Sequence, residues 1–406
     1  MTETGECPAT GAAGHPTVRT SPFDPPRELT ARITEEPLRR LRYPDGHVGW
    51  LVTGHELARA VLADRRFSAR SEFKRPPVSR PSIEPFYGVP ALPGWMVDMD
   101  APGHTRLRRM LMGRFTLRRI RDLRPRIEAL VTELLDGLEH RGGPVDLVEH
   151  FCLPVPTVMI CELLGVPYAE RALFQHHTEV LFSLSSTADE AAGAMDKLYV
   201  LLRRLAKGGP DSPRDGLLAE LAAGGTDPEE TAGIGTLLLT AGHETTSSML
   251  SLSVFALLSH PEQLNRFVAA ASGPDGTGNA IEELLRYLTV FHFGVPRTPL
   301  EDVELAGRLL RAGEAVTVSL PAANRDPRVF GDPDRLDLGR RTSTHLAFGY
   351  GVHQCLGQNL ARLELAVALP ALFRRLPALS LAVPADEVPL GGDMGVYRLH
   401  RLPVIW

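Results

Sequence analysis

The 406-residue sequence predicts a mainly α-helical fold with a minor β portion. The strongest indication is the stretch from Pro228 to His260, which is apolar on most sides of a helix and should therefore be buried. Shorter helical patterns lie before and after it, and strand-like alternation is confined to short segments. Because no linker or internal repeat divides the chain, we predict a disordered tail over residues 1–20 and a single domain over residues 21–406.

The first half of the chain begins with a predicted strand over Gly46–Thr53 and a short helix over His55–Leu62. Six prolines in Lys74–Gly94 predict a long irregular loop, of the kind that often forms a lid or a binding loop. Thr105–Gly142 is expected to form two arginine-rich helices. Val145–Leu164 then shows an apolar helical pattern.

In the middle of the chain, Arg171–Leu184 and Glu190–Leu205 predict a pair of helices before the long apolar one. After it we expect a helix over Ala280–Leu288 and β-type segments over Val303–Leu320. The stretch Ala322–Thr344 is rich in Arg, Asp and Pro and shows little periodicity, which indicates irregular structure.

Composition narrows the class of protein. The chain is 43% hydrophobic and 23% charged, which is typical of soluble globular proteins, and its net charge of −5 gives no sign of nucleic-acid binding. No run of eighteen apolar residues occurs, so no membrane span is predicted. The four cysteines lack disulfide or zinc spacing, which favours a reducing cytoplasm, and we expect a monomer. The basic residues are almost all arginine, which indicates a GC-rich, actinobacterial-type coding sequence.

One cysteine, Cys355, stands in a glycine-rich loop that reads Phe348 to Gly357, and an apolar helical pattern follows it over Leu356–Leu369. Backbone N–H groups of such a loop and of the helix N-terminus favour a thiolate, and Phe348 would shield one side. A thiolate suits the axial position of a haem iron. The alternative is a buried structural cysteine after a glycine turn.

The long helix contains an unusual string, Ala241-Gly242-His243-Glu244-Thr245-Thr246. Glycine costs about 1 kcal/mol relative to alanine inside a helix, and a buried Glu is rare unless it has a partner or a task. The alternative is a kink at which Thr245 bonds back to the preceding turn.

These strings resemble motifs of the cytochrome P450 superfamily. Phe-Gly-x-Gly-x-His-x-Cys-x-Gly is similar to its haem-binding signature, and the acid–alcohol string is similar to its oxygen-activation motif. Three further motifs of the family occur in the expected order: the His-x-x-x-Arg pattern of His104 and Arg108, Glu283-x-x-Arg286, and the turn-rich stretch Ala323–Asp334. The resemblance therefore covers about residues 25–406. It is closest in kind to the soluble bacterial members.

The resemblance implies a triangular helical prism that encloses haem b between the central helix and the helix of the cysteine loop. It makes Cys355 the iron ligand and makes Glu244 and Thr245 the catalytic pair, in which Thr245 donates to dioxygen and Glu244 relays protons. The further residues that it places around the haem, several at the propionates, are His104, Arg108, Ala241, Gly242, Arg297, Phe348, Gly349, His353 and Gly357.

The same resemblance gives Glu283 and Arg286 a structural role, in which both bond to an arginine of the segment before the cysteine loop. The candidates for that arginine are Arg325, Arg328, Arg335, Arg340 and Arg341. Position favours Arg335 or Arg340.

A substrate pocket is predicted by position, and its residues are mostly apolar: Phe86, Tyr87, Leu92, Phe182, Leu238, Ala241, Val290, Phe291, Phe293 and Met394. We therefore expect a sizeable, largely neutral substrate. By similarity to actinobacterial relatives, we expect a natural product such as a polyketide or macrolide antibiotic precursor.

The resulting hypothesis is a monooxygenase that inserts one atom of O2 by hydroxylation or epoxidation, in a single step or in successive oxidations. Its electrons would come from NAD(P)H through a ferredoxin reductase and a ferredoxin, and a run of arginines offers a docking surface: Arg106, Arg109, Arg114, Arg118, Arg119 and Arg121. The alternatives are an H2O2-driven peroxygenase and a non-enzymatic haem sensor. Glu244 and Thr245 argue against both, since neither needs a proton relay.

Overall fold

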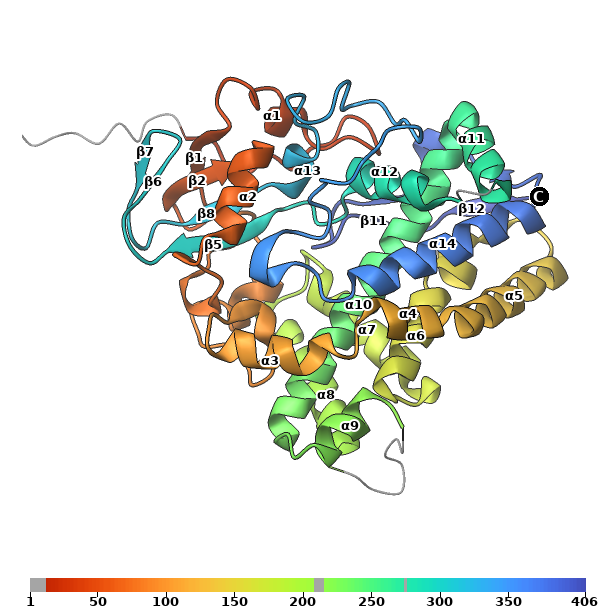
Figure 1. Ribbon diagram of the computed structural model, residues 1–406, viewed down its shortest axis with the longest axis horizontal. Coiled ribbons are helices and arrows are strands. Elements are labelled where there is room, and N and C mark those ends of the chain that lie inside the picture. The colour runs from red at the N-terminus through yellow and green to blue at the C-terminus, as the bar shows by residue number, and fades with distance from the viewer. Residues whose placement is uncertain (1–11, 208–214, 274–275) are drawn as a thin grey trace, which may run out of the picture.

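The computed structural model describes residues 12–207, 215–273 and 276–406. Figure 1 shows most of the strands gathered at one end of the molecule, while helices form the rest. The largest cluster of buried apolar residues draws on the chain from Phe23 to Val404. The predicted mainly helical fold with a minor β portion is confirmed.

The main sheet has five strands in the order β1-β2-β8-β5-β3. Its strands are β1 (Leu38–Arg42), β2 (Val48–Val52), β8 (Val316–Val318), β5 (Val295–Pro299) and β3 (Phe67–Ser68). The pair β2 and β8 is parallel, with Trp50 opposite Val316, and the other pairs are antiparallel. Helix α2 (His55–Ala63) follows β2 directly and packs with this sheet in a second apolar cluster.

Small antiparallel sheets complete the β portion of the described residues. Their strands are β4 (Val145–Asp146), β6 (Val303–Leu305), β7 (Arg308–Leu310), β9 (Ser380–Leu381), β10 (Leu390–Gly391), β11 (Arg398–Leu399) and β12 (Pro403–Ile405). The pairs are β6 with β7, β10 with β11, and β12 with both β4 and β9.

The long helix α10 (Pro228–Ser259) runs through the centre of the molecule (Figure 1). Its start is set by Asp227, whose carboxylate accepts from the N–H groups of Glu229 and Glu230 at 2.8 and 3.3 Å, and by Pro228 at the first helical position. The helix is buried on nearly every side, as its apolar composition predicted.

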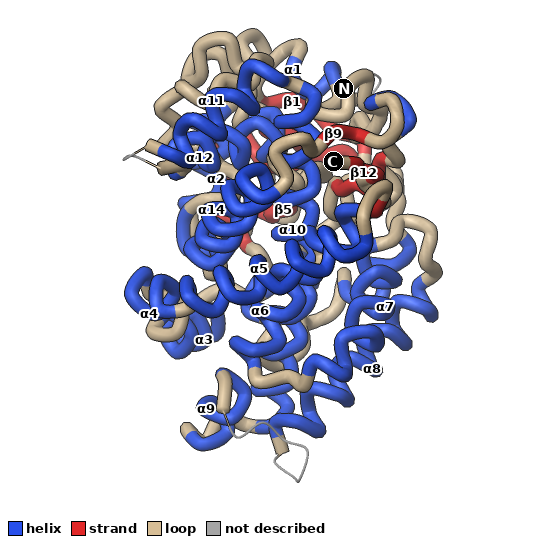
Figure 2. The backbone as a smooth tube through the Cα atoms, turned by 90° about the vertical axis from the view of Figure 1, so that its right-hand side faces the viewer, coloured by secondary structure: helices blue, strands red, loops and turns tan. Residues whose placement is uncertain are grey.

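The helices around α10 are arranged as Figure 2 shows, with α5, α6, α7 and α8 away from the strands. Their bounds are α5 (Arg124–Arg141), α6 (Pro154–Leu164), α7 (Arg171–Phe182), α8 (Ala188–Ala206), α9 (Leu217–Ala223), α11 (Pro261–Ser272), α12 (Gly278–Leu288), α13 (Leu320–Ala323) and α14 (Gln358–Arg375). A short helix α1 (Arg27–Thr30) precedes the main sheet.

Two predicted helical segments differ from the structure. Thr105–Gly142 forms three helices, α3 (Gly103–Met112), α4 (Leu117–Asp122) and α5, because Thr116 adopts an extended backbone and caps α4 by accepting from Arg119 N. The 145–164 segment begins as strand β4 and a π-helical turn, Val148–Cys152, before α6 begins. Helices α9 and α11 were not predicted.

The predicted N-terminal tail of residues 1–20 is described only from residue 12 on. Residues 12–20 lie against the domain: Arg42 N donates to Ala13 O at 2.9 Å, and Gly14 forms a parallel bridge with Arg42. Residues 1–11 of the predicted tail lie outside the described residues. Within the part of the chain that is described, no helix has the length and apolarity needed to cross a membrane.

Candidate active site

The cysteine loop is fixed against helix α2. Gly349 and Gly351 have positive φ angles of 69° and 72°, and a Cβ on Gly351 would lie 2.4 Å from Leu62 O. Cys355 N donates to Phe348 O at 2.9 Å, which closes the loop just before α14. Both positions therefore favour glycine through their positive φ, as the sequence predicted, and at Gly351 the close approach of Leu62 O leaves no room for a side chain.

Cys355 is an exposed cysteine, whereas Cys152 and Cys161 are buried. Desolvation by the surrounding protein raises the pKa of the Cys355 thiol. That pKa is lowered by hydrogen bonds from the N–H groups of Gly357 and Gln358 and by the charges of Arg108 and Arg362. Burial raises the pKa of Cys161 to about 12. Among the described cysteines, Cys355 is thus the accessible thiol that has cations and backbone donors to stabilise a thiolate.

Helix α10 has one accessible place in its buried middle. Between Thr231 and Leu257 every residue is buried except Ala241, Gly242 and Thr245. Gly242 packs tightly on α6, since a Cβ there would lie 3.0 Å from Cδ1 of Ile160. An exposed thiol and an accessible patch on an otherwise buried helix are what a large bound group would cover, so these residues fit a haem.

The acid and the alcohol of α10 have different partners. The Thr245 hydroxyl donates to Ala241 O at 2.9 Å, which is the back-bonding considered from the sequence. Glu244 is buried and accepts from Arg398 Nη1 at 3.0 Å, and Arg398 Nη2 donates to Glu179 at 2.8 Å. The side-chain exposures rise along this chain, from 6% for Glu244 through 15% for Arg398 to 60% for Glu179, so it links α10 to the surface. Sequence reasoning missed Arg398 and Glu179.

Four basic side chains predicted at the haem propionates form a group. The rings of His104 and His353 lie 4.1 Å apart between centroids, and these two residues line one cleft together with Arg297. Burial lowers the pKa of His353 to about 2, with Arg297 as the next cause, and burial lowers that of Arg297 to about 10. Arg108 and Arg297 form no ion pair among the described residues, so the group is suited to an anion.

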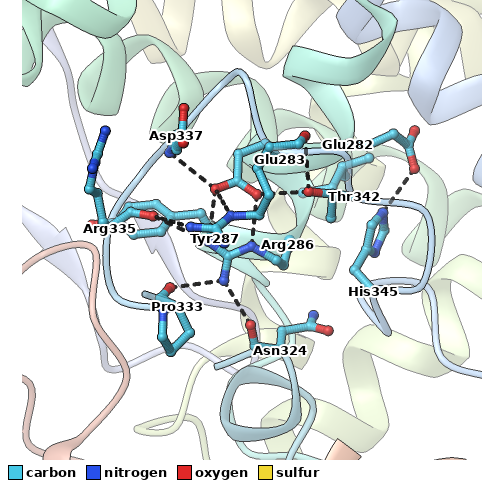
Figure 3. Close-up of polar contacts among 12 residues, drawn as sticks. Glu282, Glu283, Arg286, Tyr287, Asn324, Pro333, Arg335, Asp337, Thr342 and His345 are labelled. Atoms are coloured by element: carbon cyan, nitrogen blue, oxygen red, sulfur yellow. Dashed lines mark hydrogen bonds and ion pairs between the residues drawn. The ribbon is translucent and has the colours of Figure 1, made fainter. Parts of the chain in front are cut away.

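The predicted Glu283–Arg286 pair is fully buried, and Figure 3 shows its bonds. Both nitrogens Nε and Nη2 of Arg286 donate to the Glu283 carboxylate at 2.8 Å. Of the two favoured arginines, Arg340 forms the ion pair, with its Nε 3.1 Å from Glu283 Oε1, and Arg335 contributes only its backbone carbonyl. Thr342 Oγ1 donates to the same carboxylate at 3.0 Å.

This network is joined to the segment that leads to the cysteine loop. Arg286 Nη1 donates to Asn324 O at 2.8 Å, and the Asn324 side chain accepts from Leu346 N at 2.7 Å. A second group, missed from the sequence, lies beside it: Glu282 accepts from His345 at 2.9 Å and from Arg362 of α14 at 2.6 Å. Burial works against ionisation of Glu282, but these two partners lower its pKa to about 2.

The segments predicted to line the substrate pocket meet one another. Ser82 Oγ of the proline-rich loop donates to Ser183 O at 2.8 Å, Gly395 N donates to Phe182 O at 2.6 Å, and Tyr397 N donates to Val290 O at 2.9 Å. The individual pocket residues differ in exposure. The buried ones are Leu238, Val290, Phe293 and Met394, the half-buried ones are Phe86, Tyr87 and Phe182, and the exposed ones are Leu92, Phe291 and Ala241.

Comparison with known proteins agrees with this geometry. The family model described as Cytochrome P450 matches residues 277–385. The chain is 47% identical over 394 residues to Cytochrome P450 105C1 of a Streptomyces species, which covers 96% of this chain and 97% of that protein.

Solved structures agree over the whole fold. The crystal structure of CYP105P1 in complex with filipin I has a TM-score of 0.90 at 39% identity and covers 98% of this chain and 99% of that one. The mycinamicin VIII C21 methyl hydroxylase of Micromonospora griseorubida, bound to mycinamicin VIII, has a TM-score of 0.89 at 34% identity and covers 98% of this chain and all of that one (100%). With its cysteine loop, the accessible patch on its buried central helix and 47% identity to a P450 over 96% of its length, the chain belongs to the cytochrome P450 family and is a cytochrome P450 monooxygenase.

Proposed function

We propose that this monooxygenase uses haem b to insert one oxygen atom of O2 into a sizeable, mostly apolar natural product of the polyketide or macrolide type. The observation that carries the proposal is the pairing of an exposed, cation-flanked thiol at Cys355 with an accessible patch at Ala241 and Thr245 on a buried helix. When bound, the haem would supply the activation of O2.

The chain's own residues would hold that group in defined ways. Cys355 would ligate the iron, with Phe348, Gly349 and Gly357 shaping the loop around it. His104, Arg108, Arg297 and His353 would receive the propionates, because these basic residues lie together and neither Arg108 nor Arg297 forms an ion pair among the described residues.

Thr245 and Glu244 would bring protons to the oxygen site. The Thr245 hydroxyl lies in the accessible patch and donates to Ala241 O, so it can rotate to a new acceptor without a change of backbone. Glu244 bonds to Arg398, which also bonds to Glu179, so these three side chains would connect the oxygen site with the surface. The proposed relay is supported by the position of Thr245 in the accessible patch and by the rise in exposure from Glu244 to Glu179.

The proposed substrate class rests on the pocket and on relatives. The pocket segments are mainly apolar, and the similar proteins whose names state a substrate include one bound to filipin I and one that hydroxylates the C21 methyl group of mycinamicin VIII. A pentalenic acid synthase of Streptomyces avermitilis, 43% identical over 410 residues, adds a further natural-product enzyme.

Electrons are proposed to arrive from a ferredoxin on the side of α3 and α4, close to Cys355. The charge of Arg108 on α3 is close enough to lower the pKa of the Cys355 thiol, and α4 packs on α14, the helix that follows the cysteine loop. Two of the predicted docking arginines are already paired, Arg106 with Glu230 and Arg114 with Glu220. The unpaired ones among the described residues are Arg109, Arg118, Arg119 and Arg121, and we assign docking to these four.

The cysteine assignment is tested by the absorption spectrum of the reduced carbon monoxide complex. Wild type should show the red-shifted Soret band of a thiolate-ligated haem, and Cys355→Ser should lose it. Cys152→Ala and Cys161→Ala serve as controls and should keep the band. Retention of the band in Cys355→Ser would refute the assignment.

The relay is tested by coupling, the ratio of product formed to NADH consumed with ferredoxin and reductase added. Thr245→Ala should keep the carbon monoxide band but release peroxide and lose product, since a positioned proton donor contributes roughly 10²–10⁴-fold. Full product formation from H2O2 alone, with no gain from NADH and the redox proteins, would favour a peroxygenase instead.

A further inference from the structure

The N-terminal segment of residues 12–24, here called the strap, is fastened at both ends. At its start Arg42 N of β1 donates to Ala13 O at 2.9 Å. At its end Phe23 packs on Phe255 of α10 with 4.9 Å between ring centroids, and Asp24 forms an ion pair with Arg325 at 3.0 Å. Both ends of the strap are therefore attached to the domain.

The middle of the strap contacts Tyr397. The Arg19 guanidinium carbon lies 3.7 Å from the centre of the Tyr397 ring, and the Tyr397 hydroxyl donates to Pro22 O at 2.7 Å. Tyr397 is 1% exposed, and burial lowers the pKa of Arg19 to about 10, which still leaves the cation intact at neutral pH. A cation over a buried aromatic face is attracted more strongly than one in water.

Tyr397 in turn sits between two segments that carry predicted pocket residues. Its N–H donates to Val290 O at 2.9 Å, and its ring lies 5.6 Å from that of His292. His292 Nε2 donates to Met394 O at 2.7 Å, and its ring stacks on Phe293 at 3.8 Å. Tyr397 thus joins the strap to residues 290–293 through its N–H and its ring contact with His292, and His292 in turn bonds to Met394 O.

The strap has a second contact with the same group. His15 is buried, and its ring meets that of Phe293 edge-on with 6.1 Å between centroids. From Met394 the contacts continue to helix α7, because Gly395 N donates to Phe182 O at 2.6 Å. Val290 and Phe293 are therefore within two contacts of the strap, and Met394 and Phe182 lie further along the same chain of contacts.

We propose that Arg19 is a positioning residue for substrate selection: through Tyr397 it braces the pocket wall formed by residues 290–293 and 394–397. A braced wall loses less conformational freedom when a bulky ligand packs on it, so Arg19 favours large ligands over small ones. The inference rests on the proposed function, because it takes Val290, Phe293 and Met394 as pocket residues.

The test uses two nitrogen ligands that bind haem iron, imidazole as the small probe and econazole as the bulky one, in spectral titrations. Arg19→Ala should weaken econazole binding by about three- to tenfold and leave imidazole within about twofold of wild type. Arg19→Lys, which keeps a cation, should recover most of the affinity. Val18→Ala is the matched control, since Val18 is a strap residue that is 73% exposed.

Hydrogen–deuterium exchange gives a readout that does not need haem. Peptides covering residues 288–295 and 392–399 should exchange faster in Arg19→Ala and in Tyr397→Phe than in Val18→Ala, with α10 unchanged. Equal loss of imidazole and econazole affinity, or unchanged affinity for both, would overturn the inference. Wild-type protein that takes up no haem would instead contradict the proposed function, and the exchange rates of the two peptides would still decide whether Arg19 braces the wall.

Discussion

At the scale of single residues, two buried glutamates differ in whether they have hydrogen-bond or ion-pair partners. Glu283 is met by Arg286, Arg340 and Thr342, so its burial is compensated. Glu364 of α14 is 2% exposed and has no hydrogen bond or ion pair among the described residues, and burial raises its pKa to about 8. Two buried acids in neighbouring helices thus differ in that only Glu283 has polar partners in the described part of the chain.

Glu364 predicts a pH dependence of stability. The folded protein keeps its proton up to about pH 8, whereas the unfolded chain releases it near 4.5. The stabilisation is therefore complete below pH 4.5 and is lost as pH rises through 8, at about 1.4 kcal/mol per pH unit. Relative to Glu364→Gln, wild type should lose about 3 kcal/mol of unfolding free energy between pH 5 and 7.5, measured by urea denaturation. An exposed control, Glu262→Gln, should show no such difference, and a constant difference for Glu364→Gln would contradict the prediction.

The ion pair of Glu244 and Arg398 predicts a different outcome. Arg398→Ala leaves a buried carboxylate without its cation, which should cost about 3 kcal/mol of unfolding free energy. Glu179→Ala removes only the 60% exposed end of the same chain and should cost less than about 1 kcal/mol. Chemical denaturation of the two variants at pH 7 measures both effects, and equal losses would show that Glu244 does not depend on Arg398.

Whether a site residue can be predicted from the sequence depends on whether its partners lie near it or far from it along the chain. The cysteine loop can be predicted from local sequence, because it has glycines at positive φ and a helix that begins three residues after Cys355. Arg340 is one of the two arginines that position favours. Arg398 lies 154 residues from Glu244 along the chain. No local sequence pattern indicates that an arginine forms an ion pair with so distant a buried acid. Whether these residues act as proposed stays a prediction.

At the scale of elements, the end of the proline-rich loop is held on α10 by two glycines. A Cβ on Gly233 would lie 1.7 Å from Pro93 O, and one on Gly94 would lie 2.3 Å from Glu230 O. The sequence gives only an irregular loop here, because a backbone contact between distant segments leaves no periodic pattern. The structure shows that part of this loop is docked rather than free.

Substitution at this contact should separate packing from helix propensity. Gly233→Ala forces the loop away from α10 and should lower the free energy of unfolding by about 1–3 kcal/mol, with faster hydrogen exchange over residues 88–96. Gly137→Ala, at an exposed position in α5 with nothing within 4 Å of the new Cβ, should instead stabilise by about 0.5–1 kcal/mol. Thermal unfolding of both variants checks the signs, and a stabilising Gly233→Ala would show that the contact is not tight.

At the scale of the whole molecule, charge is unevenly distributed. The chain has a net charge of −5, yet α3 and α4 carry arginines that are exposed and free of ion pairs among the described residues: Arg109, Arg118, Arg119 and Arg121. The same segments expose Met112 and Leu117, and Val352 is exposed in the cysteine loop. Exposed apolar side chains and unpaired arginines on the same helices are typical of a surface that docks an acidic protein.

Electrostatic docking should appear in the rate of the first electron transfer from reduced ferredoxin, followed by stopped-flow under carbon monoxide. At sub-saturating ferredoxin the rate should fall as salt rises, because exposed charges are screened beyond about 8 Å at physiological ionic strength. Arg109→Glu and Arg121→Glu should lower the rate by about tenfold or more at low salt and flatten its salt dependence, since steering changes association by about 10–10³-fold. Arg126→Glu on α5 is the matched control, because Arg126 is exposed but already paired with Glu162 at 2.6 Å. If all three reversals slowed transfer equally, the effect would be one of net charge, and the four unpaired arginines would have no particular part in docking.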